Sequence, residues 1–275
     1  MKFTKMAIAI PARISSSRLP RKVLERIDGK TILSLVLEKC KIAMPKELIF
    51  VCTDSEEIKN LAIDQGFRVF MTSENCSSGS DRISSVINDL LSILWGCDFS
   101  SLKYNEKQKK MHETLIINVQ ADQPFLNPEI IKNMINEAKK DEEDFDVITP
   151  IYKLVNAKIH NPNVVKVLLS NNNRILYFSR SAIPYLRDHE KKNWGDSFLY
   201  WGHVGIYGYR ANILKSWNSM KNSLLEKAEK LEQLRLIENG YSFKTFEVKE
   251  DSLSIDTYEQ LEEAREFAKS SNLNS

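Results

Sequence analysis

The chain has 275 residues, enough for one large α/β domain with or without a small appendage. Hydrophobic residues make up 42% and charged residues 28% of it, which is the composition of a soluble globular protein. The formal net charge of +2 gives no general argument for binding nucleic acid or an acidic membrane, so an anion-binding site would have to be local.

The N-terminal sequence and the cysteines argue against other classes. The segment MKFTKMAIAI lacks the hydrophobic region and cleavage site of a signal peptide, and no window approaches about 18 apolar residues. We therefore expect a cytoplasmic protein without a membrane span. Cys40, Cys52, Cys76 and Cys97 show no CxxC spacing and no nearby histidine pair, so we interpret them as reduced thiols without a metal role.

The first seventy or so residues alternate between strand and helix patterns. Apolar runs at 6–10 and 48–52 predict buried strands, and 68–71 predicts a third. Helical apolar spacing covers 31–40, and Ser55 is placed to cap a second helix. Repeated strand–helix–strand units predict a parallel sheet with right-handed crossovers.

The rest of the chain continues this pattern, apart from one polar segment. Residues 96–113 are polar and lysine-rich without periodicity, which predicts an exposed insertion in a loop conformation. We find no repeat and no linker, so residues 1–275 are expected to form one domain. Strands are predicted at 115–119, 147–151, 164–169, 200–209 and 243–248, a hairpin turn at 171–173, and helices at 79–94, from Pro128, at 224–238 and at 258–269.

A basic loop follows the first predicted strand, in the stretch IAIPARISSSRLPRKVL. Its two prolines exclude a regular helix, and its serines and backbone N–H groups suit phosphate oxygens. No GxxxxGK[ST] motif is present, so this is not a Walker loop. For Arg13, Arg18 and Lys22 together we favour anion binding. For Arg21 alone we favour a solvated side chain.

Two aspartates, Asp122 and Asp256, each follow a predicted strand. Ligands of open α/β sheets bind outside the carboxyl ends of the strands, where the basic loop also lies. A lone aspartate in such a place is more often a turn or helix cap than a metal ligand. Together the pair suits Mg²⁺, which takes one or two carboxylates and leaves its other positions to phosphates and water.

Three further stretches carry weaker signals. Residues 77–82 can form a helix N-terminus that faces an anion or base, or can simply be a serine cap. His203 is either a functional residue or a core histidine satisfied by hydrogen bonds. Glu232 lies in a predicted helix, where a solvated charged face is the simpler interpretation.

Several stretches together resemble one family, the 3-deoxy-manno-octulosonate (KDO) cytidylyltransferases, also called CMP-KDO synthetases. The similarity runs from about residue 8 to 267, apart from 96–113. The order and spacing of the motifs make the resemblance specific. The motifs are PARxxSxRLPxKxL at 11–24, TD at 53–54, SGxDR at 78–82, VQxDxP at 119–124, NPNxVKV at 161–167, YFSRxxIP at 177–184, HxGIYGYR at 203–210, LExxExLEQLR at 225–235 and DT at 256–257.

The resemblance implies a Rossmann-like nucleotidyltransferase fold, with a mixed, mostly parallel sheet flanked by helices and a smaller dimerisation element. It implies a homodimer that makes CMP-KDO and pyrophosphate from CTP and KDO with Mg²⁺, for lipopolysaccharide or capsule. The implied roles divide into four groups. Arg13, Lys22 and Asp122 are catalytic; Ala12, Arg13, Arg18, Lys22, Ser78 and Arg82 bind the nucleotide; Gln120, His203, Tyr207 and Glu232 bind the sugar; and Asp122 and Asp256 hold the metal.

The sequence departs from the family pattern in the basic loop and in the VQxDxP motif. Ile14, Ser15 and Arg21 replace tyrosine and two glycines, and Ala121 and Gln123 replace glycine and glutamate. An amino-KDO or a sialic-acid-like sugar is therefore an alternative substrate. An inactive nucleotide-binding scaffold is an alternative of another class.

Overall fold

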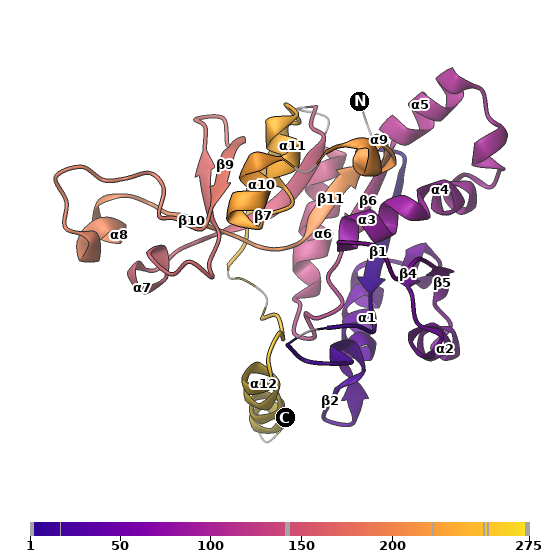
Figure 1. The fold of residues 1–275 in the computed structure, drawn as a ribbon, viewed down its shortest axis with the longest axis horizontal. Coiled ribbons are helices and arrows are strands. Elements are labelled where there is room, and N and C mark those ends of the chain that lie inside the picture. Colours follow the sequence, from indigo (N-terminus) through magenta and orange to yellow (C-terminus); the bar gives the residue numbers. More distant parts are fainter. Residues whose placement is uncertain are drawn as a thin grey trace.

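A mixed sheet organises the protein (Figure 1). The computed structural model describes residues 3–16, 18–140, 144–221, 223–249, 251 and 253–272. The sheet has the strand order β5-β4-β1-β6-β11-β7-β10-β8-β9, with β12 paired to β7. The strands are β1 Lys5–Ala12, β4 Ile49–Thr53, β5 Arg68–Met71, β6 Thr114–Asn118, β7 Val147–Lys153, β8 Lys166–Leu169, β9 Ile175–Ser179, β10 Trp201–His203, β11 Tyr207–Arg210 and β12 Phe243–Glu247, beside a small hairpin of β2 Arg26–Ile27 and β3 Lys30–Thr31.

Helices cover both faces of the sheet. Ile8 and Ile10 of β1 face one group of helices, while Ala7 and Ala9 face the other, which explains why this strand is apolar throughout. The first group is α1 Ile32–Ala43, α2 Glu56–Asp64 and α6 Pro128–Lys139. The second is α3 Gly79–Ser85, α4 Ile87–Trp95, α9 Ala211–Ser216 and α11 Leu234–Glu238.

The predicted parallel order is confirmed for the first half of the chain. Strands β5, β4, β1 and β6 are parallel neighbours, so their carboxyl ends meet at one edge of the sheet. Beyond them, β11 lies antiparallel between β6 and β7, which makes the sheet mixed as expected. Ser55 caps α2 as predicted, because its hydroxyl accepts the N–H of Ile58 at 3.4 Å.

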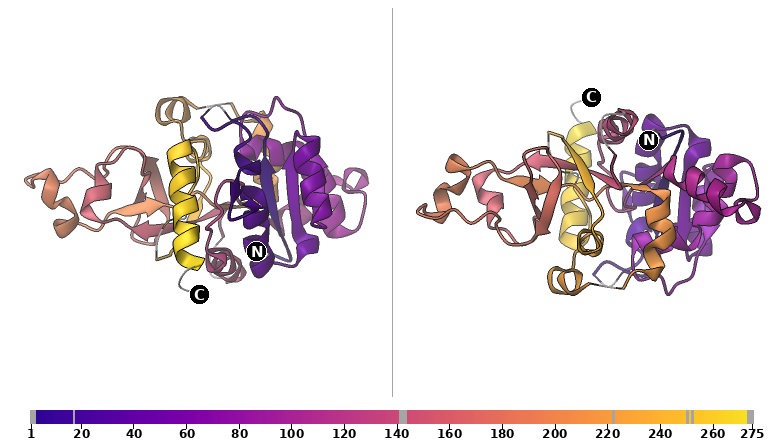
Figure 2. Two further views of the ribbon diagram at one scale, coloured as in Figure 1. Left: turned by 90° about the horizontal axis from the view of Figure 1, so that it is seen from below. Right: turned by 90° about the horizontal axis from the view of Figure 1, so that it is seen from above.

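A projecting arm extends the second half of the sheet. It consists of β8, β9 and β10 with the short helices α7 Asn156–Ile159 and α8 Trp194–Ser197, and it points away from the α/β body (Figures 1 and 2). The predicted hairpin turn is confirmed, with Asn173 at φ 57° and Ser170 N–H donating to Arg174 O at 2.9 Å.

The segment 96–113 lies mostly at the surface, as predicted, but the expectation that it forms a loop is wrong. Residues Tyr104–His112 form helix α5, and Phe99 and Met111 are buried against the neighbouring helices. The Lys110 ammonium also lies 3.8 Å from the centre of the Trp95 ring. Two anchoring apolar residues are too few to give a periodic signal, although lysine, glutamate and glutamine favour helix.

Three predicted elements are each divided in two. The helix predicted at 79–94 breaks at Val86, between α3 and α4. The helix predicted at 224–238 is α10 Leu224–Glu229 and α11, separated where Lys230 takes a left-handed φ of 55°. The strand predicted at 200–209 is β10 and β11, which both pair with β7 but have different second neighbours. Asn239 and Gly240 end α11 as predicted, with Gly240 at φ 79°.

The C-terminal helix α12, Tyr258–Asn272, packs on the β2–β3 hairpin, and Figure 2 shows it lying between the arm and the body. Its buried Leu261 joins Leu19 and Ile255 in a small core of its own. This docking places Asp256 beside the basic loop. Within the described ranges, none of the helices combines the length and apolar character needed to cross a bilayer.

Candidate active site

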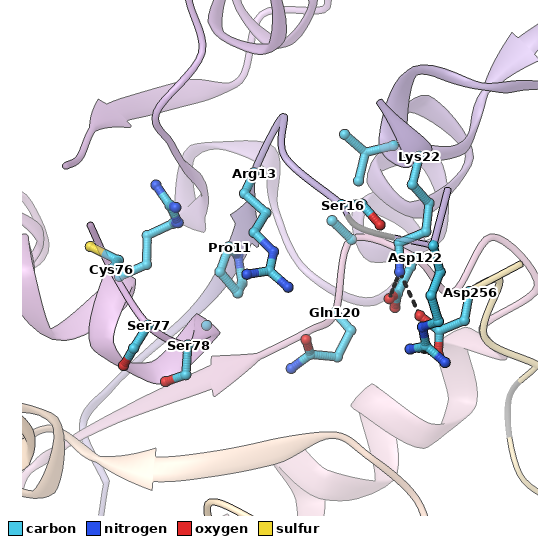
Figure 3. Close-up of a pocket in the computed structure, with 15 residues that line it drawn as sticks. Pro11, Arg13, Ser16, Lys22, Cys76, Ser77, Ser78, Gln120, Asp122 and Asp256 are labelled. Carbon is cyan, nitrogen blue, oxygen red and sulfur yellow. Dashed lines mark hydrogen bonds and ion pairs between the residues drawn. The ribbon is translucent and has the colours of Figure 1, made fainter. Parts of the chain in front are cut away.

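A polar cavity of about 210 Å³ lies at the carboxyl ends of the parallel strands (Figure 3). Residues from the basic loop, from the start of α3, from the segment after β6 and from the approach to α12 line it. Arg13, Arg18, Lys22 and Arg82 bring four cations to it and two aspartates bring carboxylates, a formal excess of two positive charges. The cavity is therefore suited to an anionic ligand.

Lys22 joins the two predicted metal ligands at one end of the cavity. Its ammonium lies 2.6 Å from Asp122 Oδ2 and 2.9 Å from Asp256 Oδ1, although these residues are 100 and 234 positions away along the chain. Arg18 adds a second cation at 3.1 Å from Asp256 Oδ2. The sequence prediction that these two aspartates meet the basic loop is thus correct in geometry.

These contacts shift the pKa values of Lys22 and Asp256. Burial alone lowers the pKa of Lys22, but the charges and hydrogen bonds of Asp122 and Asp256 outweigh it and the pKa is raised. Burial alone raises the pKa of Asp256, yet Lys22 and Arg18 lower it overall. The lysine and Asp256 are both charged near neutral pH.

The two carboxylates of this cluster are donors that suit a magnesium ion, because Mg²⁺ prefers hard oxygen ligands. Lys22 bridges them here, so a metal between the carboxylates would have to displace its ammonium. Within the described ranges, no group of three or more histidine, cysteine, aspartate or glutamate residues is arranged to hold a metal alone. A metal bound at Asp122 and Asp256 would therefore need further oxygens from a phosphate or from water.

The basic loop is held from outside the cavity as well. Arg21 takes a left-handed conformation with φ 56°, where a glycine would be less strained. Its Nη2 donates to both carboxylate oxygens of Glu57 of α2, at 2.5 and 2.7 Å. Arg21 is 57% exposed and does not line the cavity, which agrees with the prediction of a solvated side chain. Arg13 lines the cavity without an ion pair to any residue that the structure describes.

The N-terminus of α3 forms the opposite end of the cavity from Asp122 and Asp256 (Figure 3). Ser78 caps this helix by accepting the N–H of Asp81 at 3.2 Å, and it also lines the cavity. The serine cap predicted for 77–82 is therefore present, and this helix N-terminus also borders the cavity. Gly79 must lack a side chain, because a Cβ there would lie 2.9 Å from the ring of Pro11.

A buried polar cluster lies behind the cavity wall. We use this name for Ser80, Asn118, Tyr209 and Glu232. Ser80 Oγ donates to Glu232 Oε1 at 2.9 Å and lies 3.4 Å from Tyr209 Oη and 3.5 Å from Asn118 Nδ2. Gln120 lines the cavity and connects the two regions, since its Nε2 donates to Asn118 Oδ1 at 3.3 Å.

The electrostatics of this cluster differ from those of the cavity. Glu232 Oε2 is buried and has no hydrogen-bond partner among the described residues. Burial raises the pKa of Glu232, although the hydroxyls of Ser78 and Ser80 oppose the shift. The interpretation of Glu232 as part of a solvated charged face is therefore wrong, because the residue faces the protein interior.

His203 and Tyr207 lie deeper in the sheet. His203 Nε2 is 2.9 Å from Thr149 Oγ1, and burial lowers the pKa of His203 to about 3, so the ring is neutral. Tyr207 stacks on Tyr209 with 5.5 Å between ring centres. Neither residue lines the cavity. The structure gives His203 the contacts of a satisfied core histidine, and a role for His203 or Tyr207 with a sugar stays a prediction.

The cavity thus brings together most, but not all, of the residues implicated by the sequence. Ala12 is fully buried at the end of β1 and does not line the cavity. Cys76, which lines the cavity, is not among the residues predicted from the sequence, and Asp54, which is part of the TD motif, has no predicted role although it contacts Arg82 at 2.7 Å. The position of Asp54 after β4 was a usable signal, since the other site residues also follow strands.

Comparison with known proteins agrees with this geometry. A family profile described as Cytidylyltransferase matches residues 7–94 and 99–269. A 3-deoxy-manno-octulosonate cytidylyltransferase of Elusimicrobium minutum is 38% identical over 94% of this chain and 96% of its own. An 8-amino-3,8-dideoxy-manno-octulosonate cytidylyltransferase of Shewanella pealeana is 35% identical over 93% and 95%. A solved CMP:2-keto-3-deoxy-manno-octonic acid synthetase complexed with CTP covers 98% of this chain and 100% of its own, with 30% identity and a TM-score of 0.81.

Proposed function

The chain belongs to the cytidylyltransferase family, and on that premise we propose that it transfers CMP from CTP to the anomeric hydroxyl of KDO and releases pyrophosphate. The observation that carries this proposal is the meeting of four cations and two carboxylates in one cavity. A triphosphate needs cations, and a metal shared with it needs the carboxylates.

Each part of the cavity has a task in this reaction. Arg13, Arg18 and Lys22 would hold the triphosphate, and Arg82 with Ser78 would contact the rest of the nucleotide. Asp122 and Asp256 would hold Mg²⁺. The metal, when bound, would neutralise charge on the attacking and leaving oxygens. The protein mainly positions the reactants, because a sugar hydroxyl is itself the nucleophile.

The sugar acid would bind toward the buried polar cluster. Gln120 lines the cavity, and Glu232 lies behind it with an unpartnered carboxylate oxygen. A sugar hydroxyl is a suitable donor for that oxygen. His203 and Tyr207 lie further in and would need a rearrangement of the wall to make contact.

The experiment that tests this function measures pyrophosphate release with CTP, Mg²⁺ and KDO, with each component omitted in turn. We expect release only from the complete mixture, and more with CTP than with ATP, GTP or UTP. Binding of CTP without release from any sugar acid would favour the scaffold alternative.

A second substrate is supported by one specific observation. The Shewanella pealeana relative acts, by its name, on 8-amino-3,8-dideoxy-manno-octulosonate and is almost as similar to this chain as the KDO enzymes. Turnover on KDO, its 8-amino analogue and a nine-carbon acid separates these cases. A lower kcat/KM for KDO than for either of the others would overturn the KDO assignment.

We further propose a cytoplasmic homodimer formed through the arm, which serves the synthesis of lipopolysaccharide or capsule. Tyr185, Phe198 and Leu199 are 74%, 42% and 45% exposed on the arm, which supports a partner surface there. The mass in solution by light scattering tests this, and a wild-type protein that is monomeric at micromolar concentration would contradict it. Phe198→Asp with Leu199→Asp should weaken the dimer.

A further inference from the structure

Asp54 lies at the carboxyl end of β4, one residue after the strand ends, and its two oxygens hold two different parts of the cavity. Oδ1 accepts the backbone N–H of Ile14 at 3.2 Å, and Oδ2 accepts from Arg82 Nη2 at 2.7 Å. Ile14 directly follows Arg13 in the basic loop. One carboxylate thus connects that loop to helix α3.

Arg82 is held from a second side as well. Its Nη1 donates to Thr72 Oγ1 and, at 3.4 Å, to Ser73 O, just after β5. The Arg82 and Asp54 side chains are only 3% and 6% exposed. A buried guanidinium without a carboxylate is strongly unfavourable, so the position of Asp54 determines where this charge sits.

The pair connects the ends of neighbouring strands at the edge where the cavity opens. The contacts of Asp54 and Arg82 tie together segments that follow β1, β4 and β5, which are parallel neighbours. Arg82 itself lines the cavity, whereas Asp54 does not. Asp54 would therefore act on a ligand through other residues.

Another buried arginine shows what a merely structural pair looks like in this protein. Arg210 is 2% exposed and pairs at 2.5 Å, near the amino end of β6, with Asp144, whose own side chain is 74% exposed. It is not a lining residue of the cavity. The Asp54–Arg82 pair differs because its cation faces the ligand site and its carboxylate also holds the basic loop.

We propose that Asp54 is a positioning residue for nucleotide binding, which fixes Arg82 and the Arg13 segment in the arrangement that receives CTP. This inference rests on the proposed function. Preorganised cations need no rearrangement when the anion binds, and a small misplacement of them weakens binding and turnover.

The test compares Asp54→Asn with Asp144→Asn in titrations of CTP with Mg²⁺ and no sugar acid. The asparagine keeps the size of Asp54 and an acceptor for Ile14 N–H, but it removes the charge that orients Arg82. We expect the Kd for CTP to rise by about ten- to a hundredfold in Asp54→Asn and to stay within about twofold in Asp144→Asn. The Kd for KDO should change little in either variant.

The outcomes separate a positioning role from a structural one. A lower melting temperature in both variants with the wild-type Kd for CTP would overturn the inference. If Asp54→Asn fails to fold, Thr72→Val tests the same inference, because it removes one contact of Arg82 and leaves the ion pair. A rise of about threefold or more in the Kd for CTP then supports the inference, and an unchanged Kd overturns it. Absence of CTP binding by the wild-type protein would instead refute the proposed function.

Discussion

The cavity and the buried polar cluster are neighbours, but the carboxylates in the two regions have different partners. In the cavity, the carboxylates of Asp122 and Asp256 each have a cation within 2.6–3.1 Å. In the cluster, Glu232 has hydroxyl partners, one oxygen without a partner among the described residues, and a raised pKa. The carboxylates of the cavity are therefore already paired, whereas the cluster retains an acceptor that a ligand could use; on the proposed function, these would be the nucleotide side and the sugar side of the site.

The strongest way to test the cavity side of this comparison is Asp122→Ala. We expect turnover to fall by about a thousandfold or more, because this carboxylate would hold the metal beside the reacting phosphate. The fold should remain, since Asp122 is partly exposed. Steady-state pyrophosphate release measures the loss, with the exposed Asp64→Ala as the control. Near-normal activity would refute the metal role of Asp122.

On the cluster side, Glu232→Gln should affect the sugar and spare the nucleotide. Loss of a charged hydrogen bond to the substrate corresponds to a rise of about ten- to a hundredfold in the KM for the sugar acid. The KM for CTP should stay within about twofold. Equal increases in both KM values would show that Glu232 supports the site as a whole and does not contact the sugar.

The pH dependence of stability tests the protonation state of His203, a buried residue outside both regions. Its pKa is lowered to about 3 in the folded protein and is about 6.5 when unfolded, so the unfolded state binds more protons between these values. Its contribution to stability is complete above pH 6.5. Below that pH, it is lost at about 1.4 kcal/mol per pH unit until the folded pKa is reached.

Urea unfolding between pH 7.5 and 5 measures this slope. His203→Gln should flatten it. An unchanged slope in His203→Gln would mean that the ring is protonated in the folded state.

The smallest effect is expected at the outer surface of the basic loop, in Arg21→Gly. A left-handed conformation costs a non-glycine residue about 1–2 kcal/mol, and an exposed ion pair returns about 0.2–1 kcal/mol. The free energy of unfolding of the variant should therefore lie within about 1 kcal/mol of the wild-type value, and its kcat should be unchanged. Thermal unfolding and the standard assay test this, and Glu57→Ala isolates the ion pair. A large loss of activity in Arg21→Gly would place Arg21 in the catalytic machinery.

The order of elements was predictable because the parallel half of the sheet is buried on both faces. Apolar runs such as 6–10 and 48–52 mark such strands directly. The sequence does not mark breaks made by tertiary packing. The turn at Lys230, which carries neither glycine nor proline, and the α5 helix, with its few apolar residues, were both missed for that reason.

The same limit applies to the site. Asp122, Asp256 and Lys22 were found because each follows a strand or lies in an unusual loop, where parallel topology forces convergence. The TD motif contains Asp54, but its pairing with Arg82 was not predictable, because sequence does not tell which carboxylate a buried arginine will face. The burial of Glu232 was missed because a charged residue in a helical segment has the same pattern whether it faces solvent or core.

The docking of α12 determines when the site can form during translation. Asp256 is held near Lys22 by the packing of Ile255 and Leu261 against Leu19 near the start of the chain, and by the Ile255 N–H, which donates to Asp122 O at 2.9 Å. A chain still being translated holds its basic loop and Asp122 long before it holds Asp256. The nascent protein is therefore expected to stay inactive until this last helix leaves the ribosome and closes the site.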